Sequence, residues 1–305
     1  MQNKFRGVMQ SPVTPLKDDF SLDLPTFERV LDFHVRSGAP AISWPHHKGE
    51  SLNLTIAERK LFAEAAVKVV AGRVPVTIHA SALAVEDTMA LARHAQDIGA
   101  DGILAITPYF WNPSLEAIEA YFVRLCSSID LPVLSYNSPS YLAGVEITGD
   151  LMARLIEKLP NFVGVVDAGM DWVYMVEVIS NGRKPRPDFQ LLPATDYMVS
   201  ARVMGGLGAF SALSAVAPKL VRQVYDACQK EDYKSARAGQ EDLATLRHLL
   251  KHPRLETGLK VALGAMGREC GVPRPPVRPL GEVERGRMTD ALAKLPSLRS
   301  EPRGW

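Results

Sequence analysis

The chain has 305 residues, of which 47% are apolar and 23% charged, the proportions of an ordinary soluble globular protein. Its 35 basic and 34 acidic side chains nearly cancel, so charge gives no reason to expect nucleic acid or an anionic membrane as a partner. A small neutral or weakly anionic molecule is the expected ligand.

Short apolar runs bounded by proline or glycine alternate with amphipathic helical patterns. The runs predicted as strands span residues 7–13, 39–45, 74–79, 101–106, 131–136, 162–167, 190–194 and 207–210. Helical patterns cover residues 24–37, 55–71, 85–98, 115–128 and 149–158, and later residues 219–250 and 256–270. The repeat of roughly 30 residues is typical of a βα unit with its loops.

Eight such units predict an α/β protein with a closed (β/α)8 TIM barrel. We expect the barrel to occupy residues 1–220 and a C-terminal helical extension of the same domain to occupy residues 221–305. No GxGxxG sequence follows the first predicted strand, which argues against a dinucleotide site. No cofactor is predicted.

The remaining composition indicates a reducing compartment. Cys126, Cys228 and Cys270 are far apart and form no CxxC pair, so neither a disulfide framework nor a thiolate zinc site is expected. The first residues lack the apolar core of a signal peptide, and no stretch reaches the ~18 apolar residues of a membrane span. We therefore expect a cytoplasmic protein.

Local motifs follow several of the predicted strands. They are Val13-Thr14-Pro15, Lys48-Gly49-Glu50-Ser51, Thr107-Pro108-Tyr109, Tyr136-Asn137-Ser138-Pro139 and Gly208-Ala209-Phe210-Ser211-Ala212. In order and spacing, they resemble the dihydrodipicolinate synthase / N-acetylneuraminate lyase family of pyruvate-dependent aldolases, over about residues 5–270.

The resemblance implies a TIM barrel, commonly a homotetramer, that binds a 2-oxo acid at the C-terminal face of its strands. In this family a lysine on the sixth strand forms an imine with the substrate, and a tyrosine at the end of the fifth strand moves protons. Tyr136 matches that tyrosine. Tyr109, Asn137, Phe210 and Ser211 lie in the matched motifs and are expected to contact the substrate.

The sixth strand departs from the family at its central position. The family has glycine, an apolar residue, lysine and an acidic residue, whereas this chain has Gly164-Val165-Val166-Asp167. Valine cannot form an imine, so the family mechanism lacks its nucleophile.

The loop after the second strand departs as well. The family's Gly-Thr-Thr-Gly-Glu is replaced by His46-His47-Lys48-Gly49-Glu50, which could hold a carboxylate by charge. Phe110 stands where synthases have a second tyrosine, and Tyr141 falls near the place of their substrate-binding arginine. Dihydrodipicolinate synthesis is therefore not expected.

Lys48 has three interpretations. It could be a relocated imine-forming lysine, a lysine that binds the substrate carboxylate, or a loop lysine that is solvated or paired with Glu50. Gly49 and Glu50 are expected, like Lys48, to bind the substrate, and Glu50 also to brace the loop against neighbouring amides.

The histidines His46, His47 and His79 fall at predicted strand ends and could serve as general bases near neutral pH. A metal site built from His46, His79 and Asp167, with Asp196 as a further ligand, is an alternative. It is disfavoured because adjacent histidines on a strand point to opposite faces. Otherwise Asp167 is expected to support the site, and Asp196 to orient a substrate hydroxyl.

We interpret the chain as an enzyme, a carbon–carbon or carbon–oxygen lyase acting on a small 2-oxo or hydroxy acid without the imine of the sixth strand. Tyr136 and the three histidines would supply acid–base chemistry. Two alternatives stay open: a non-catalytic barrel that binds 2-oxo acids or sugar acids, and a metal-assisted aldolase.

Overall fold

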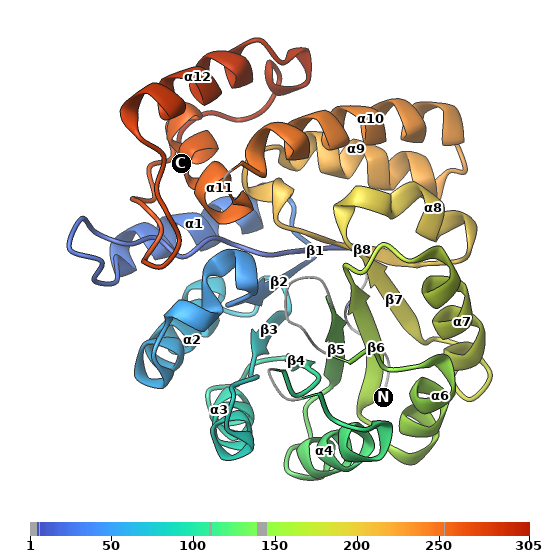
Figure 1. Cartoon of the computed structure of the whole chain (residues 1–305). Coiled ribbons are helices and arrows are strands. Elements are labelled where there is room, and N and C mark those ends of the chain that lie inside the picture. Colours follow the sequence, from blue (N-terminus) through green and yellow to red (C-terminus); the bar gives the residue numbers. More distant parts are fainter. Residues whose placement is uncertain (1–4, 6, 110–111, 139–144, 253) are drawn as a thin grey trace.

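The computed structural model describes residues 5, 7–109, 112–138, 145–252 and 254–305 (Figure 1). Its strands are β1 (Gly7–Gln10), β2 (Ala41–Trp44), β3 (Val76–His79), β4 (Gly102–Ile106), β5 (Val133–Asn137), β6 (Phe162–Asp167), β7 (Gln190–Pro193) and β8 (Gly208–Ser211). Neighbouring strands pair in parallel from β1 to β7, and β8 pairs with β1. A bridge between Ala194 and Phe210 closes the ring, which confirms the predicted (β/α)8 barrel.

The barrel strands alternate with helices on the outside. These helices are α1 (Leu24–Arg36), α2 (Ile56–Val70), α3 (Val85–Asp97), α4 (Leu115–Ser127), α6 (Gly149–Lys158), α7 (Trp172–Arg183), α8 (Met198–Val203) and α9 (Pro218–Gln229). Side-chain caps begin several of them. At α2, the Thr55 hydroxyl accepts the Glu58 amide hydrogen, and the Glu58 carboxylate accepts that of Thr55. Such a capping box fixes the start of the helix.

Two apolar layers hold the barrel together. Outward side chains such as Ile42, Ile78 and Val165 pack against the helices. Inward side chains fill the barrel itself and include Phe5, Met9, Leu104, Leu134, Val163 and Leu192, followed toward the C-terminal ends by Tyr136, Val166 and Phe210. The interior is therefore a packed core, and a cavity opens at its C-terminal end.

The C-terminal extension consists of α10 (Tyr233–Leu250), α11 (Leu255–Ala265) and α12 (Glu282–Ala293). The helical pattern predicted over residues 219–250 is broken, because Glu231 has a φ of 59° and Asp232 caps a new helix. The boundary expected at residue 220 falls inside α9. The extension shares one apolar cluster with α9 and β8, and Figure 1 shows it gathered on one side of the barrel.

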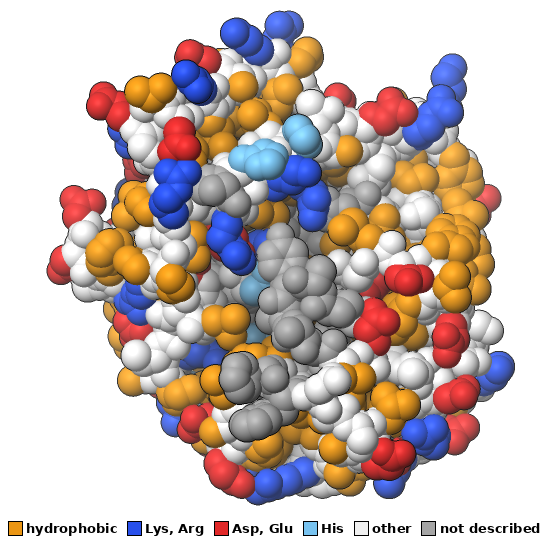
Figure 2. Space-filling view, viewed as in Figure 1, with side chains coloured by type: hydrophobic (Ala, Val, Ile, Leu, Met, Phe, Trp, Pro, Cys, Tyr) orange, Lys and Arg blue, Asp and Glu red, His pale blue; other side chains and the backbone are white. Residues whose placement is uncertain are grey.

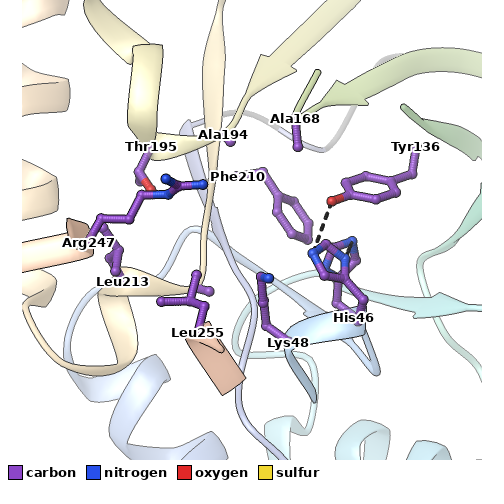
Figure 3. Close-up of a pocket in the computed structure, with 12 residues that line it drawn as sticks. His46, Lys48, Tyr136, Ala168, Ala194, Thr195, Phe210, Leu213, Arg247 and Leu255 are labelled. Carbon is purple, nitrogen blue, oxygen red and sulfur yellow. Dashed lines mark hydrogen bonds between the residues drawn. The ribbon is translucent and has the colours of Figure 1, made fainter. Parts of the chain in front are cut away.

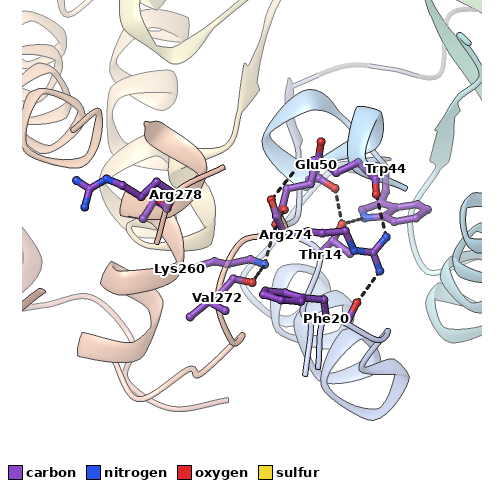
Figure 4. A network of polar contacts seen from close by, with 11 residues as sticks. Thr14, Phe20, Trp44, Glu50, Lys260, Val272, Arg274 and Arg278 are labelled. Atoms are coloured by element: carbon purple, nitrogen blue, oxygen red, sulfur yellow. Dashed lines mark hydrogen bonds and ion pairs between the residues drawn. The ribbon is translucent and has the colours of Figure 1, made fainter. Parts of the chain in front are cut away.

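A buried ion pair ties this extension to the loop after β2. That loop contains two short 3-10 helices, η1 (His47–Gly49) and η2 (Ser51–Asn53), joined at Glu50 with a φ of 59°. The Glu50 carboxylate lies 2.7 Å from Lys260 Nζ on α11, with the side chains 1% and 3% exposed. Lys260 also donates to the Val272 carbonyl, and the Arg274 amide donates to Glu50 Oε2 (Figure 4).

Glu50 therefore braces the loop, as expected, but it does so through Lys260 and Arg274 and is turned away from any substrate. Lys48 is not its partner, and that part of the interpretation is wrong. The ammonium of Lys48 instead lies 3.4 Å from Glu256 Oε1 on α11. The loop is thus held by α11 at two points.

We predict that Lys260→Met destabilises the protein by about 3–5 kcal/mol, because it leaves the Glu50 charge buried without a counterion. Urea denaturation of the variant measures the loss. The double variant Glu50→Gln/Lys260→Met removes both charges and should recover most of it. A double variant as unstable as the single one would contradict a cost that arises from the uncompensated carboxylate.

Candidate active site

A cavity opens at the C-terminal ends of the barrel strands (Figure 3). It is lined by His46, His47, Lys48, Tyr136, Ala168, Ala194, Thr195, Phe210, Ala212, Leu213, Arg247 and Leu255. Its volume of about 60 Å³ is smaller than the ~150 Å³ cavity that admits benzene. It therefore suits a ligand, or part of one, with few heavy atoms.

The two histidines of the β2 loop lie side by side on one wall. Because β2 ends at Trp44 and η1 begins at His47, the alternation of a strand does not apply to them, and the expectation of opposite faces is wrong. Their ring centroids are 4.0 Å apart, and His47 Nδ1 lies 3.2 Å from His46 Nε2. His47 Nε2 lies 3.4 Å from the Tyr136 hydroxyl, so these rings form one hydrogen-bonded chain.

Val166 occupies the position on β6 beside Tyr136. The two residues are register partners, and Val166 is fully buried in the same inner cluster as Tyr136 and Phe210. The His46 ring packs above this cluster, 4.3 Å from the Tyr136 ring and 4.7 Å from the Phe210 ring, measured between centroids. An aliphatic group therefore lies next to the tyrosine, at the position where the family resemblance leads us to expect a lysine.

Lys48 is the lysine that lines the cavity. Its side chain is 8% exposed, and Figure 3 shows its ammonium directed into the cavity from the same loop as His46. Its partner Glu256 also lies 3.5 Å from Arg254. Glu256 thus pairs with Lys48 while the ammonium still faces the cavity.

Burial controls the protonation of the histidines. Desolvation, with a smaller effect from nearby positive charge including that of Lys48, holds the pKa of His46 and of His47 well below 6.5. Desolvation and the charge of Arg59 do the same to the pKa of His79. All three rings are therefore neutral at neutral pH, and each has one nitrogen that can accept a hydrogen bond. His79 is 4% exposed and lies beneath the cavity, not in its lining.

Asp167 and Asn137 lie outside the cavity lining. The Asp167 carboxylate accepts hydrogen bonds from Asn137 Nδ2 at 2.8 Å and from the Gly169 amide at 3.1 Å. The Tyr197 hydroxyl donates to its other oxygen. Burial raises the pKa of Asp167. The pair thus joins the ends of β5, β6 and β7, which agrees with a supporting role for Asp167 and gives Asn137 no place beside the ligand.

Other residues expected at the site have structural contacts. The Gly49 carbonyl accepts a hydrogen bond from the Thr14 hydroxyl, and Ser211 Oγ accepts from the Ser214 amide. Tyr109 packs half-buried against the inner cluster, outside the cavity lining, and burial raises its pKa. The side chain of Asp196, in η3 (Thr195–Tyr197), lies outside the described part of the structure, as do Phe110 and Tyr141.

Asp167 does not join His46 and His79 in a metal site. Among the described residues, no group of three or more histidine, cysteine, aspartate or glutamate side chains is placed to hold a metal ion. His46 and His79 are neighbours, with ring centroids 6.2 Å apart, but Asp167 is engaged by Asn137 and Tyr197. Among the described side chains, which do not include that of Asp196, the candidates therefore do not fit a three-ligand metal site.

The C-terminal extension contributes a wall of the cavity that no sequence pattern predicted. Arg247 from α10 and Leu255 from the start of α11 line the cavity opposite Tyr136, next to Thr195 (Figure 3). Figure 2 shows Lys and Arg side chains between the extension and the centre of this face. No motif marks these residues, because they lie on helices beyond the last strand.

In the part of the chain that the structure describes, no helix is long and apolar enough to cross a membrane.

Residues 4–295 match the model of a protein family whose description is "Dihydrodipicolinate synthetase family". The 4-hydroxy-tetrahydrodipicolinate synthase of Gluconacetobacter diazotrophicus is 33% identical over 291 residues, 94% of this chain and 96% of that protein.

A second relative, described as the probable 2-dehydro-3-deoxy-D-pentonate aldolase YjhH of Escherichia coli, is 32% identical over 234 residues, 76% of this chain and 77% of its own. The crystal structure of the E. coli K12 prophage protein YagE in complex with pyruvate superposes with a TM-score of 0.90. It is 28% identical and covers 96% of this chain and 99% of its own. The chain therefore belongs to the dihydrodipicolinate synthetase family.

Proposed function

We propose that this protein is a lyase that acts on a small 2-oxo or hydroxy acid through acid–base chemistry and not through an imine on β6. The observation that carries the proposal is the position of Val166, buried beside Tyr136 where the imine-forming lysine would have to lie. The complex of YagE with pyruvate and the sugar-acid aldolase among the relatives support a short 2-oxo acid as the ligand class.

The cavity offers positive charge to such an acid. Lys48, from the β2 loop, and Arg247, from α10, both contribute cationic groups to the cavity, and the histidines beside Lys48 are neutral (Figure 3). Hydrogen bonds from a cation to a carboxylate are stronger than neutral ones, and arginine can form two in parallel. We assign the carboxylate of the substrate to Lys48, with Arg247 binding a more distant oxygen.

Tyr136 and His47 would move the proton. The neutral His47 ring can accept a hydrogen bond from the Tyr136 hydroxyl, which orients that hydroxyl toward the cavity. The Tyr136 hydroxyl passes its proton to His47 Nε2 as its oxygen takes the proton next to the substrate carbonyl, which leaves an enolate whose negative charge the Lys48 ammonium stabilises. The proton on His47 then returns through Tyr136 to a neighbouring hydroxyl, which leaves as water. For carbon–carbon cleavage, the same pair would instead take the proton of a hydroxyl on the carbon β to the carbonyl, and the bond breaks to give a carbonyl product and the enolate. Neither route needs an imine.

Dihydrodipicolinate synthesis is not our proposal, because that chemistry in the family depends on the lysine that Val166 replaces. The same valine favours a second candidate, a barrel that binds 2-oxo acids or sugar acids without turnover. A homotetramer remains an expectation from family membership.

We predict that the wild-type protein converts at least one acid from a panel of 2-oxo and sugar acids, and that Tyr136→Phe lowers kcat by about 10²–10⁴-fold, because the phenylalanine has no hydroxyl to carry the proton. Product formation is followed by chromatography, and ligand binding by calorimetry.

The matched control is Lys48→Met, which should weaken binding of the acid by roughly 10–100-fold, the value of a hydrogen bond to a charged group. Tyr136→Phe should leave binding nearly unchanged. Saturable binding with no turnover of any acid by the wild type would reject the lyase and establish the non-catalytic candidate.

The buried histidines also predict a dependence of stability on pH. Burial lowers the pKa of His34 to about 3 and holds those of His46, His47 and His79 well below 6.5. Below about pH 6.5 the unfolded chain takes up protons that the folded protein does not, so the free energy of unfolding falls as the pH decreases. Each histidine contributes at most about 1.4 kcal/mol per pH unit.

Urea denaturation at about pH 7.5 and about pH 5.5 measures this change. His34→Leu removes one of these groups and should make the decline shallower. Equal stability of the wild type at the two pH values would show that the folded protein takes up protons at these rings as readily as the unfolded chain does.

A further inference from the structure

A group of buried polar atoms lies inside the barrel, beneath the cavity. His46 Nδ1, both ring nitrogens of His79 and the hydroxyls of Ser11 and Ser43 have no hydrogen-bond partner among the described residues. The four residues are between 0% and 4% exposed. An unsatisfied buried donor or acceptor costs about 1–3 kcal/mol, so several together indicate that another molecule completes them.

The backbone brings these atoms to one place. Ala41 belongs to the inner cluster, so Ser43, two residues along β2, also faces the interior. Thr77 contacts Met9 inside the barrel, so His79, two residues along β3, faces the same way. The strands β1, β2 and β3 are consecutive neighbours, and the His46 and His79 rings meet nearly edge to face with centroids 6.2 Å apart.

The hydrogen bonds from Tyr136 to His47 and from His47 to His46 determine which kind of molecule can complete these atoms. A phenol is a stronger acid than a neutral imidazole, so Tyr136 donates to His47 Nε2. His47 then carries its hydrogen on Nδ1 and donates it to His46 Nε2. A neutral imidazole has one donor and one acceptor, so His46 carries its hydrogen on Nδ1, the nitrogen that lacks a partner.

That hydrogen needs an acceptor, and the lone-pair nitrogen of His79 needs a donor. A metal ion could not bind the protonated Nδ1 of His46, and an anion could not donate to His79. Water does both, and buried waters typically make about three such hydrogen bonds. The substrate does not reach His79, which is not among the residues lining the cavity.

We propose that an ordered water, held between His46 Nδ1 and His79 with Ser43 as a third partner, terminates the Tyr136–His47–His46 chain and stabilises the Nδ1–H tautomers of His46 and His47. His46 and His79 are then positioning residues that act on Tyr136 through His47. The catalytic meaning of this arrangement rests on the proposed function of Tyr136, but the water and the tautomers do not.

The test uses ¹⁵N NMR of the full-length protein with labelled histidine, which reports the tautomer of each ring. We expect the Nδ1–H form for His46 and His47 in the wild type. His79→Leu removes the anchor of the water and should cause loss of the His46 Nδ1–H signal, with a lower kcat and unchanged binding of the acid. His79→Gln keeps a donor and an acceptor and should restore both properties.

The matched control is His34→Leu, which removes another fully buried histidine. His34 is hydrogen-bonded to Gln10 and takes no part in the Tyr136–His47–His46 hydrogen bonds. It should leave the His46 and His47 signals unchanged. A high-resolution crystal structure of the wild type checks the water directly and does not depend on any variant folding.

Nε2–H tautomers in the wild type, a metal ion or an anion between His46 and His79, or a dry site would each overturn the proposal. If the water and tautomers are found but no acid is turned over, the lyase function fails while the water site stands.

Discussion

The buried pair of Glu50 and Lys260 is the constraint on which the site depends. It holds a loop in which the backbone of Glu50 is left-handed. This conformation is unfavourable for a residue other than glycine, and contacts with the surroundings must offset its cost. From this point the preceding residues turn back over the barrel, so that His46, His47 and Lys48 face the cavity. A second contact, between Lys48 and Glu256, comes from the same helix α11. The C-terminal extension therefore shapes the site although it lies outside the barrel.

The walls of the resulting cavity differ in charge. Lys48 and Arg247 are cationic, whereas burial keeps the histidines around Tyr136 neutral, so that each presents one hydrogen-bond-accepting nitrogen. Val166 adds an aliphatic surface beside the tyrosine. Such a site can attract an acid and exchange a proton with it, but it offers no amine on β6 for covalent catalysis.

The barrel was predictable from the sequence because its strands are short apolar runs between helix patterns with clear caps. The bounds of β6 agree fully with the prediction, whereas β1 ends at Gln10, short of residue 13, because Pro12 has no amide hydrogen for the sheet. The site was less predictable. Motif matching could not separate cavity residues such as Phe210 from braces such as Ser211. It also could not reach Arg247, which is brought to the cavity only by tertiary packing.

The most direct measurement is borohydride reduction of the protein with pyruvate and with longer 2-oxo acids, read by intact mass and peptide mapping, beside calorimetry of the same acids. We predict saturable binding and no reduced adduct on any lysine, because Val166 replaces the amine of β6 and Lys48 is held by Glu256 to bind a carboxylate. A stable adduct on Lys48 would contradict this and identify a lysine aldolase whose imine has moved to the β2 loop.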